Sequence, residues 1–313
     1  MSLIEKKHMM HMDKKKQLLR TLRATALGAA ALCAMSCAPM DDGNWTKNVG
    51  LTIRWDAVSV TGVRPAGIGR MRVTLYPRNA SQGQQSFSLE GDRLEADMPT
   101  GLYAVLAMPE EHAQWLKGTD MQATTRLVLP TEKDDRGETR ITELPDEQIY
   151  AGFNGNVRGD YDHRTEGSVL MRAALHRVRL DIRVLDGREY DGAVSLMMTG
   201  LPISMDVSTM KVDTRDRGYV LAEAGRAGNA RQEAGGVMTP YASELLVFAF
   251  AGQNSLELTL RRDGKDMTMT IDLSGLLHNA LPAEATVAVT ADLRTGKIEA
   301  ALERTGLEEI HIN

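Results

Sequence analysis

The sequence predicts an all-β protein with two antiparallel β-sandwich domains in tandem, placed after a lipoprotein signal peptide. Segments in which apolar and polar residues alternate recur from Leu51 to Leu302. A period of two is the pattern of a strand with one buried and one wet face. Turn-forming glycines, prolines and asparagines separate these segments, and helical patterns are nearly absent. Two packed sandwiches are therefore the economical architecture.

The N-terminal stretch, residues 12–37, predicts export. Its lysines and arginines precede an uncharged run from Ala24 to Met35. This run is too short for a membrane-spanning helix, which needs about 20 apolar residues, so we expect it to be removed. Met12 is a more natural initiator than Met1, and the sequence leaves the choice between them open.

Cys37 is the expected lipidation site. Small Ser36 stands before it, whereas bulky Leu32 stands before Cys33. Each buried methylene contributes about 0.8 kcal/mol, so two or three acyl chains hold a protein on a membrane essentially permanently. The sequence thus predicts a lipid-anchored protein of the outer membrane, exposed at the cell surface. An ordinary cleaved signal or a membrane-associated helix is the alternative.

Charge and cysteine content exclude several classes of protein. The whole chain has a net charge of -5 although the signal stretch is cationic. The mature part is therefore more acidic still, and nothing favours nucleic acid as a partner. Both cysteines lie at or before residue 37, so we expect no disulfide, no thiol chemistry and no cofactor.

Length and turn density predict two domains. At about 150 residues per domain, the part after the signal is long enough for two cores. Glycines and polar residues crowd together between Gly152 and Gly167, which indicates a boundary there. The predicted limits are a signal peptide 1–37, a linker 38–48, an N-terminal sandwich 49–165 and a C-terminal sandwich 166–313.

Most segments of the first domain are predicted strands. Those expected there are 51–55, 71–75, 87–89, 94–98, 102–108, 127–129 and 149–151. Pro109 to Lys117 has proline first, acids early and lysine late, the order that suits a short helix. The charged segment Thr131 to Thr139 is expected to be a loop.

The second domain repeats the pattern. The strands expected there are 178–184, 194–201, 256–260, 267–271, 287–293 and 298–302. Asp263-Gly264 between alternating segments indicates a tight hairpin, because its positive backbone angles match the twist of the strands. Thr209 to Pro240 has few large apolar residues, so we expect a long loop or a frayed hairpin.

Five short stretches carry a resemblance to a known family. They are Ile53-Arg54-Trp55-Asp56, Leu75-Tyr76-Pro77, Met98-Pro99-Thr100-Gly101-Leu102-Tyr103-Ala104-Val105, His176-Arg177-Val178-Arg179-Leu180-Asp181-Ile182 and Thr199-Gly200-Leu201-Pro202. With the expected lipidated cysteine before them, the sequence resembles the fimbrillin-like lipoproteins of Gram-negative gut and oral anaerobes. This resemblance implies two transthyretin-like or immunoglobulin-like sandwiches that act in fimbria assembly, anchoring or adhesion, with no catalytic residues.

The predicted domain junction holds two candidate contact motifs. Arg158-Gly159-Asp160 matches an integrin-binding tripeptide, although three residues recur readily by chance. Asp160, Asp162 and Glu166 could offer oxygens to calcium, but the remaining ligands of a dedicated calcium loop are missing. We therefore expect this junction to be a solvated linker without a metal.

Aromatic residues make up only 4% of the chain, which limits carbohydrate recognition. Four of them, Trp115, Tyr161, Tyr219 and Tyr241, are the candidate sugar platforms. No serine lies in a nucleophile elbow, and no histidines of the expected mature part pair at metal-ligand spacing. His8 and His11 precede Met12 and are not expected to form a metal pair.

Three functions remain open from sequence alone. The first is a non-enzymatic fimbrial structural, anchoring or adhesive subunit, which binds other subunits by strand addition or binds a host protein. The second is a carbohydrate-binding outer-membrane lipoprotein of a glycan-uptake system, which needs exposed aromatic rings. The third, ranked last, is an enzyme, which needs carboxylates gathered in a cleft.

Overall fold

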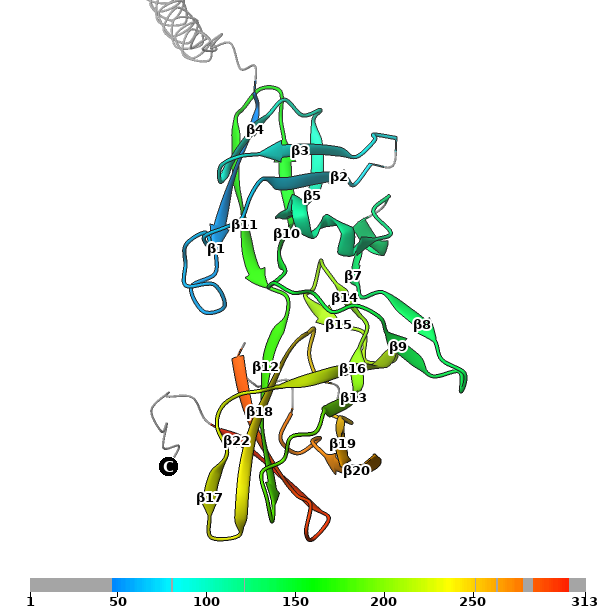
Figure 1. Ribbon diagram of the computed structural model, residues 1–313. Helices are drawn as coiled ribbons and strands as arrows, with labels where there is room; N and C mark the ends of the chain where they lie inside the picture. The colour runs from blue at the N-terminus through cyan, green and yellow to red at the C-terminus, as the bar shows by residue number, and fades with distance from the viewer. Residues whose placement is uncertain are drawn as a thin grey trace, which may run out of the picture. The chain divides into compact units, whose positions relative to one another are not determined.

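The structure is a computed structural model and describes residues 47–303 apart from 80, 121, 251, 263 and 278–283. The predicted signal peptide, Cys37 and most of the predicted linker lie outside the described residues. Within them, strands predominate and the only helices are two short 3-10 turns, so the predicted all-β fold is confirmed (Figure 1). No helix of the described part is long and apolar enough to cross a membrane.

A seven-stranded sheet forms from the first half of the described chain. Its order is β3 (Gln85–Leu89), β2 (Met71–Pro77), β5 (Gly101–Pro109), β10 (Tyr150–Gly159), β11 (Thr165–Ala173), β1 (Val49–Trp55) and β4 (Arg93–Ala96). All its neighbouring strands are antiparallel except β1 and β11, which run parallel.

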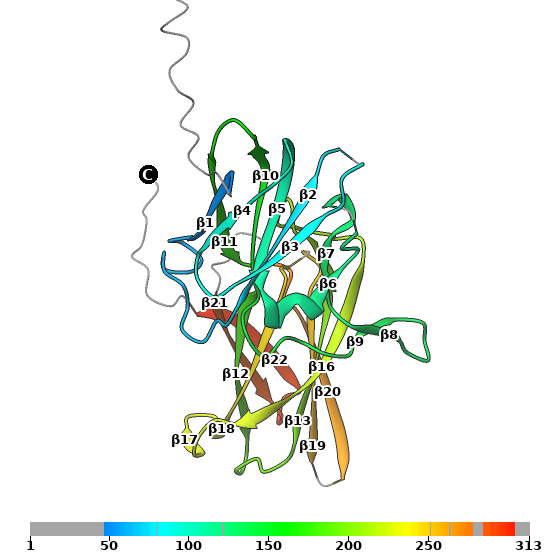
Figure 2. The same ribbon diagram turned by 90° about the horizontal axis from the view of Figure 1, so that it is seen from above.

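A larger sheet forms mostly from the second half. Its main path is β20 (Lys265–Asp272), β19 (Ser255–Arg262), β13 (Val194–Pro202), β16 (Arg217–Arg226), β18 (Gly236–Val247), β12 (His176–Asp186), β21 (Glu284–Asp292) and β22 (Lys297–Glu303). The strand β17 (Arg231–Glu233) pairs with β18. The two ends of the path, β20 and β22, lie in contact, so the sheet folds back on itself as a sandwich does (Figure 2).

Short elements join the two sheets. A third sheet contains β15 (Lys211–Val212), β14 (Ser204–Asp206), β7 (Arg126–Val128) and β6 (Leu116–Lys117). The 3-10 turns are η1 (Glu110–Trp115) and η2 (Gln122–Thr124). The helix predicted over residues 109–117 is thus present as the tighter 3-10 form.

Strands in which apolar and polar residues alternate strongly were predicted correctly. In β12, the side chains of Val178, Leu180, Ile182 and Val184 are fully buried while their neighbours are partly or fully exposed. The leucines of β19 at positions 256, 258 and 260 are also fully buried. The hairpin between β19 and β20 is confirmed, with Gly264 at a positive φ of 77°.

Of the two expectations for Thr209 to Pro240, the long loop is wrong, while β17 and β18 do pair as a hairpin. This segment contains β15, β16, β17 and the start of β18. Its inward residues on β16 include Gly218, Val220 and Ala224, which are small and buried. Small residues suffice there because the opposing layer fills the space, so the segment lacks the large apolar residues by which a strand is usually recognised.

The expected loop from Thr131 to Thr139 is a hairpin. Its strands are β8 (Thr131–Lys133) and β9 (Thr139–Ile141), which pair antiparallel. Tyr219 of β16 pairs with Arg140 of β9 in parallel, which attaches the hairpin to the larger sheet. Figures 1 and 2 both show the β8–β9 hairpin extending away from the sheets.

The predicted domain limits stay a prediction. The strand β11, residues 165–173, pairs with β1 and β10 of the first sheet, and β12 begins the second sheet at His176. A division by sheet membership therefore falls between β11 and β12, some ten residues after the predicted boundary at 165. The strands β8 and β9 belong by sequence to the first domain and by pairing to the second sheet.

The buried apolar residues form two clusters. One lies on a single face of the seven-stranded sheet and contains Leu51, Val73 and Val105. The other contains Leu106 and Met108 from the opposite face of β5 together with the core of the larger sheet. From Tyr103 to Pro109 the strand β5 is therefore buried on both faces, and its sequence there is apolar throughout.

Hydrogen bonds of the Asn48 side chain fasten the start of β1 to residues far along the chain. This side chain is 2% exposed. Its amide nitrogen donates to the carbonyl oxygens of Met98 and Asp160 at 2.8 and 3.0 Å, and its side-chain oxygen accepts from the N–H of Met98 at 2.8 Å. The sequence placed Asn48 in a polar linker, because the paired groups come from residues far along the chain.

We predict that Asn48→Ala lowers the free energy of unfolding by about 2 to 3 kcal/mol, since three buried hydrogen bonds are lost at about 1 kcal/mol each. Urea denaturation measures this. Asn79→Ala is the control, because Asn79 is exposed and, among the described residues, its side chain bonds only to Ser81 in its own turn. Equal effects of the two substitutions would contradict the proposed fastening.

His112 is a buried titratable group on η1. It is 7% exposed, and its Nδ1 has no hydrogen-bond partner among the described residues. Burial lowers the pKa of His112 below its ordinary value of 6.5, although the nearby carboxylates of Glu111 and Glu147 act in the opposite direction. The folded chain therefore favours the neutral imidazole, and the unfolded chain binds the proton more readily.

This difference in proton binding predicts that stability is full above about pH 7 and falls as the pH drops through 6.5 and below. Urea unfolding at about pH 7.5 and about pH 5 measures the loss, in a range where most carboxylates stay ionised. His112→Phe should show a clearly smaller loss. An unchanged dependence on pH in this variant would assign the effect to other groups.

Candidate functional site

A groove lies on the outer face of the larger sheet. Its wider part, about 600 Å³, lies between the β8–β9 hairpin and the strands β13, β16 and β19. A narrower part of about 380 Å³ continues along the same three strands and shares Met197, Leu221 and Glu257 with the first. We refer to both parts together as the hairpin groove.

Strand register defines the floor of the hairpin groove. Leu221 of β16 pairs with Met197 of β13, and Met197 pairs with Glu257 of β19. The next outward row contains Glu223 and Ser195. Outward side chains in a strand repeat every two residues, about 6.6 to 6.8 Å apart. The floor therefore has an apolar strip with carboxylates beside it, and Leu221 is 49% exposed.

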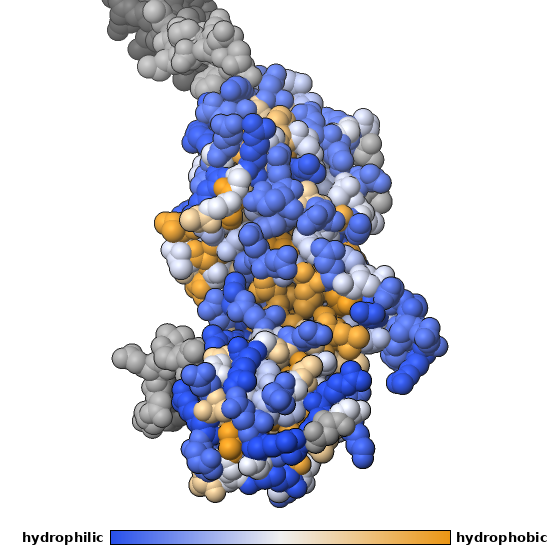
Figure 3. All heavy atoms as spheres, in the orientation of Figure 1, coloured by the Kyte–Doolittle hydropathy of each residue, from blue (hydrophilic) through white to orange (hydrophobic). Residues whose placement is uncertain are grey.

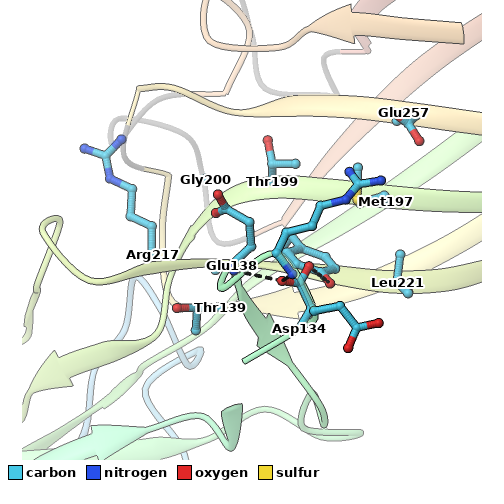
Figure 4. A pocket seen from close by; sticks show the side chains of 13 residues that line it. Asp134, Glu138, Thr139, Met197, Thr199, Gly200, Arg217, Leu221 and Glu257 are labelled. Carbon is cyan, nitrogen blue, oxygen red and sulfur yellow. Dashed lines mark hydrogen bonds between the residues drawn. The ribbon is translucent and has the colours of Figure 1, made fainter. Parts of the chain in front are cut away.

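The β8–β9 hairpin forms one wall of the hairpin groove, and hydrogen bonds to Asp134 stabilise it. One carboxylate oxygen accepts from the N–H groups of Arg136 and Glu138 at 2.9 and 2.8 Å, which closes the hairpin turn. The other accepts the hydroxyl of Tyr219 at 2.9 Å. Figure 4 shows the hairpin residues Asp134 and Glu138 facing the strands that carry Met197 and Leu221, and a dashed line marks hydrogen bonding at the hairpin.

These contacts shift two pKa values in opposite directions. Desolvation acts to raise the pKa of Asp134, but the hydrogen bonds from Tyr219, Glu138 and Arg136 outweigh it and leave the pKa below its ordinary value. The same bond to the Asp134 carboxylate, helped by desolvation, raises the pKa of Tyr219. Near neutral pH, Asp134 is therefore an anion and Tyr219 a neutral donor to it.

Gly200 and Arg217 line the far end of the hairpin groove. Gly200 has a φ of 74°, and a Cβ there would lie 2.0 Å from the carbonyl oxygen of Gln253, so only glycine fits. Arg217 donates to the Gln253 side chain at 2.8 Å and to the carbonyl oxygen of Thr214. Figure 4 shows its side chain turned away from Asp134 and Glu138.

Charge pairing differs between the two outer faces of the larger sheet. Over β12, β18 and β22, arginines pair with acids: Arg177 with Glu244, Arg179 with Asp181 and Arg183 with Glu303. Figure 3 shows mostly hydrophilic residues over these strands.

Along the hairpin groove the charges stay separate. No ion pair within the described residues involves Asp135, Glu138, Glu223 or Glu257. The hairpin groove contains five carboxylates, including that of Asp134, and only two arginines, 136 and 217. Its lining is therefore acidic, with an apolar strip on its floor.

Tyr219 is the predicted contact residue that lies in the hairpin groove. Trp115 is 5% exposed and Tyr241 is 6% exposed. The Tyr241 hydroxyl donates to the carbonyl oxygens of Tyr190 and Gly192. Both rings belong to the core, and a contact role for Trp115 and Tyr241 stays a prediction. Burial of an aromatic ring depends on distant strands, which local sequence does not reveal.

The tripeptide Arg158-Gly159-Asp160 lies at the end of β10. Arg158 and Gly159 pair with Leu102 and Gly101 of β5, and Gly159 is buried. The Arg158 guanidinium contacts the Asp160 carboxylate at 3.2 Å. The two charged groups thus engage each other, and a role in binding integrins stays a prediction.

The other junction residues are not gathered into a metal site. Asp160 accepts from the N–H of Asp162, while Glu166 pairs with Arg93 and Arg164. No group of three or more potential metal-ligating side chains occurs within the part of the chain that the structure describes. Tyr161 is 65% exposed and does not line the hairpin groove.

Sequence reasoning missed most of the hairpin groove. Asp134 and Asp135 were expected to lie in a solvated loop, and Leu221 and Glu223 in the long loop after Thr209. The segment from Tyr219 to Glu223 does alternate between outward and inward residues. This alternation was the available signal, but the small inward residues made it weak.

The chemistry of the hairpin groove suits binding. Its described lining residues include no histidine, cysteine or lysine. Outward carboxylates beside an apolar strip can attract a cation and cover its aliphatic part, and the Asp134 to Tyr219 hydrogen bond fixes one wall.

Solved structures share this fold. A candidate adhesin from Bacteroides ovatus ATCC 8483 matches with a TM-score of 0.55 and 14% identity, over 86% of this chain and 97% of that chain. A candidate adhesin from Bacteroides thetaiotaomicron VPI-5482 matches with a TM-score of 0.54 and 14% identity, over 82% and 96%. Another from Bacteroides ovatus has a TM-score of 0.55 and 11% identity, over 82% and 93%.

At these identities the likeness concerns the fold, and it agrees with the fold that the resemblance to fimbrillin-like lipoproteins implied. No protein-family model matches the sequence, and no curated protein sequence matches it either.

We predict that Asp134→Ala loosens the hairpin, because the N–H groups of Arg136 and Glu138 and the Tyr219 hydroxyl lose one shared acceptor. Hydrogen–deuterium exchange should be faster across residues 134–140 and unchanged in β12. Asp135→Ala is the matched control, since its side chain has no hydrogen bond among the described contacts. Equal exchange in both variants would show that Asp134 does not organise the hairpin.

Proposed function

We propose that this chain is a non-enzymatic binding subunit of the cell surface, with a structural, anchoring or adhesive role in a fimbria. Lipid attached to Cys37 would hold it on the outer membrane. The observation that carries the proposal is the fold, which extends over 93% to 97% of the length of three proteins described as candidate adhesins. The resemblance of short stretches to fimbrillin-like lipoproteins supports the same role.

The sheet edges support association with other subunits. The strands β20 and β22 end the path of the larger sheet, and an edge strand can accept another strand through main-chain hydrogen bonds. Lys297, Glu299 and Glu303 are exposed along β22, and charged side chains on an edge discourage indiscriminate pairing. We therefore expect a selective partner at this edge.

The alternative is a carbohydrate-binding lipoprotein of a glycan-uptake system. It is supported by one half-buried ring in the hairpin groove, Tyr219, and by the exposed Tyr161. The burial of Trp115 and Tyr241 removes two of the four rings on which this alternative depended. Adhesion or assembly is therefore the better supported role.

We predict that Cys37→Ser moves the protein from the outer-membrane fraction to the soluble fraction, because the acyl chains are lost. Fractionation with immunoblotting and mass spectrometry of the N-terminal peptide would measure this. Cys33→Ser is the control and should leave both location and acylation unchanged. Protease added to intact cells should digest the wild-type protein, and complete protection would contradict a surface role.

A glycan array separates the two candidate functions. Saturable binding of a defined glycan, lost in Tyr219→Ala, would favour the alternative. Absence of glycan binding together with capture of a polymeric surface filament by the lipid-anchored protein would favour the fimbrial role. Capture without glycan binding is the expected outcome.

A further inference from the structure

We propose that the hairpin groove binds an extended, lysine- or arginine-rich segment of a partner protein. This inference rests on the proposed binding role and specifies the chemistry of one partner. The proposed partner is a polypeptide whose basic side chains alternate with aliphatic ones. Three features of the hairpin groove lead to this partner.

The first feature is unmatched negative charge. The hairpin groove has five carboxylates against two arginines, and one of these, Arg217, is bonded to Gln253. On the opposite outer face of the same sheet, arginines on β12 pair with acids on β12, β18 and β22. A cationic partner would supply the hairpin groove with the positive charge that the other face already contains.

The second feature is the apolar strip. Leu221 and Met197 lie in one cross-strand row with Glu257. A lysine or arginine side chain has a long aliphatic stem and a charged end. Its stem would cover Leu221 and Met197 while its charged end reaches Glu257 or Glu223.

The third feature is the spacing along the strands. The row of Glu223 lies two residues beyond the row of Leu221 on β16. An extended peptide repeats its side chains on one side at the same interval of about 6.6 to 6.8 Å. Alternate residues of such a peptide would meet successive rows of the floor.

Other ligand classes fit these features less well. Tyr219 is the single aromatic residue of the described lining, and its hydroxyl already donates to Asp134. A sugar would therefore find little stacking surface. The carboxylates lie in the β8–β9 turn and on the strands β16 and β19, and they do not form a metal-binding group among the described residues.

The test uses the full-length protein in detergent and two labelled ten-residue peptides, monitored by fluorescence anisotropy. In one peptide lysine alternates with valine, and in the other glutamate replaces lysine. We expect saturable binding of the lysine peptide, weakened by added salt because the charges are exposed. The glutamate peptide should not bind.

Two pairs of substitutions locate the site. The double variant Glu223→Gln and Glu257→Gln should weaken binding of the lysine peptide by about three- to tenfold, the range expected for two exposed charge contacts. The charge-matched control is Glu233→Gln with Glu299→Gln, on β17 and β22, where both residues are exposed. It should change binding less than about twofold.

Leu221→Ser tests the apolar strip and should weaken binding at high salt as well as at low salt. Since Leu221, Glu223, Glu233 and Glu299 are exposed, none of their substitutions should alter thermal unfolding appreciably. Circular dichroism verifies this for each variant.

The proposal is overturned if the lysine peptide fails to bind saturably, if the glutamate peptide binds as well, or if both double variants weaken binding equally. Equal weakening would indicate general attraction to an acidic protein. Because peptide binding is measured on the isolated protein, it can succeed even if the protein proves not to be surface exposed. The two failures are therefore distinguishable.

Discussion

Burial of one face of each long strand is the constraint on which the structure depends. In β12 and β19 the inward side chains are fully buried, and from Tyr103 to Pro109 both faces of β5 are buried. Shifting a strand by one residue would exchange its inward and outward residues, which would expose several large apolar side chains. This constraint sets the register of β13 between β16 and β19, and that register forms the floor of the hairpin groove.

Strands with large inward residues could be predicted from the sequence because their pattern is local. Leu256, Leu258 and Leu260 identify β19 without knowledge of any neighbour. The strand β16 could not be recognised in this way, because Gly218 and Ala224 are inward residues whose burial depends on the opposing layer. Asn48 was misplaced for a related reason: its hydrogen-bond partners are 50 and 112 residues away.

The site was harder to predict than the fold. Tyr219 was a candidate because aromatic residues are scarce, and it does lie in the hairpin groove. Its neighbours Met197, Glu257 and Asp135 come from three separate parts of the chain, and no local pattern connects them. From the sequence, Trp115 and Tyr241 were candidates equal to Tyr219, but both of their rings pack in the core. Fold and site thus follow different rules: alternation identifies strands, and pairing between distant strands decides which residues share a surface.

The fastening at Asn48 has a mechanical consequence. The residue stands at the start of β1, an inner strand with β11 on one side and β4 on the other. A pull directed along β1 from its N-terminal end would load the hydrogen bonds to both neighbours in shear, so that many would have to break together. Peeling from an edge would instead break them one by one. The position where a membrane tether would transmit tension is therefore built to resist it.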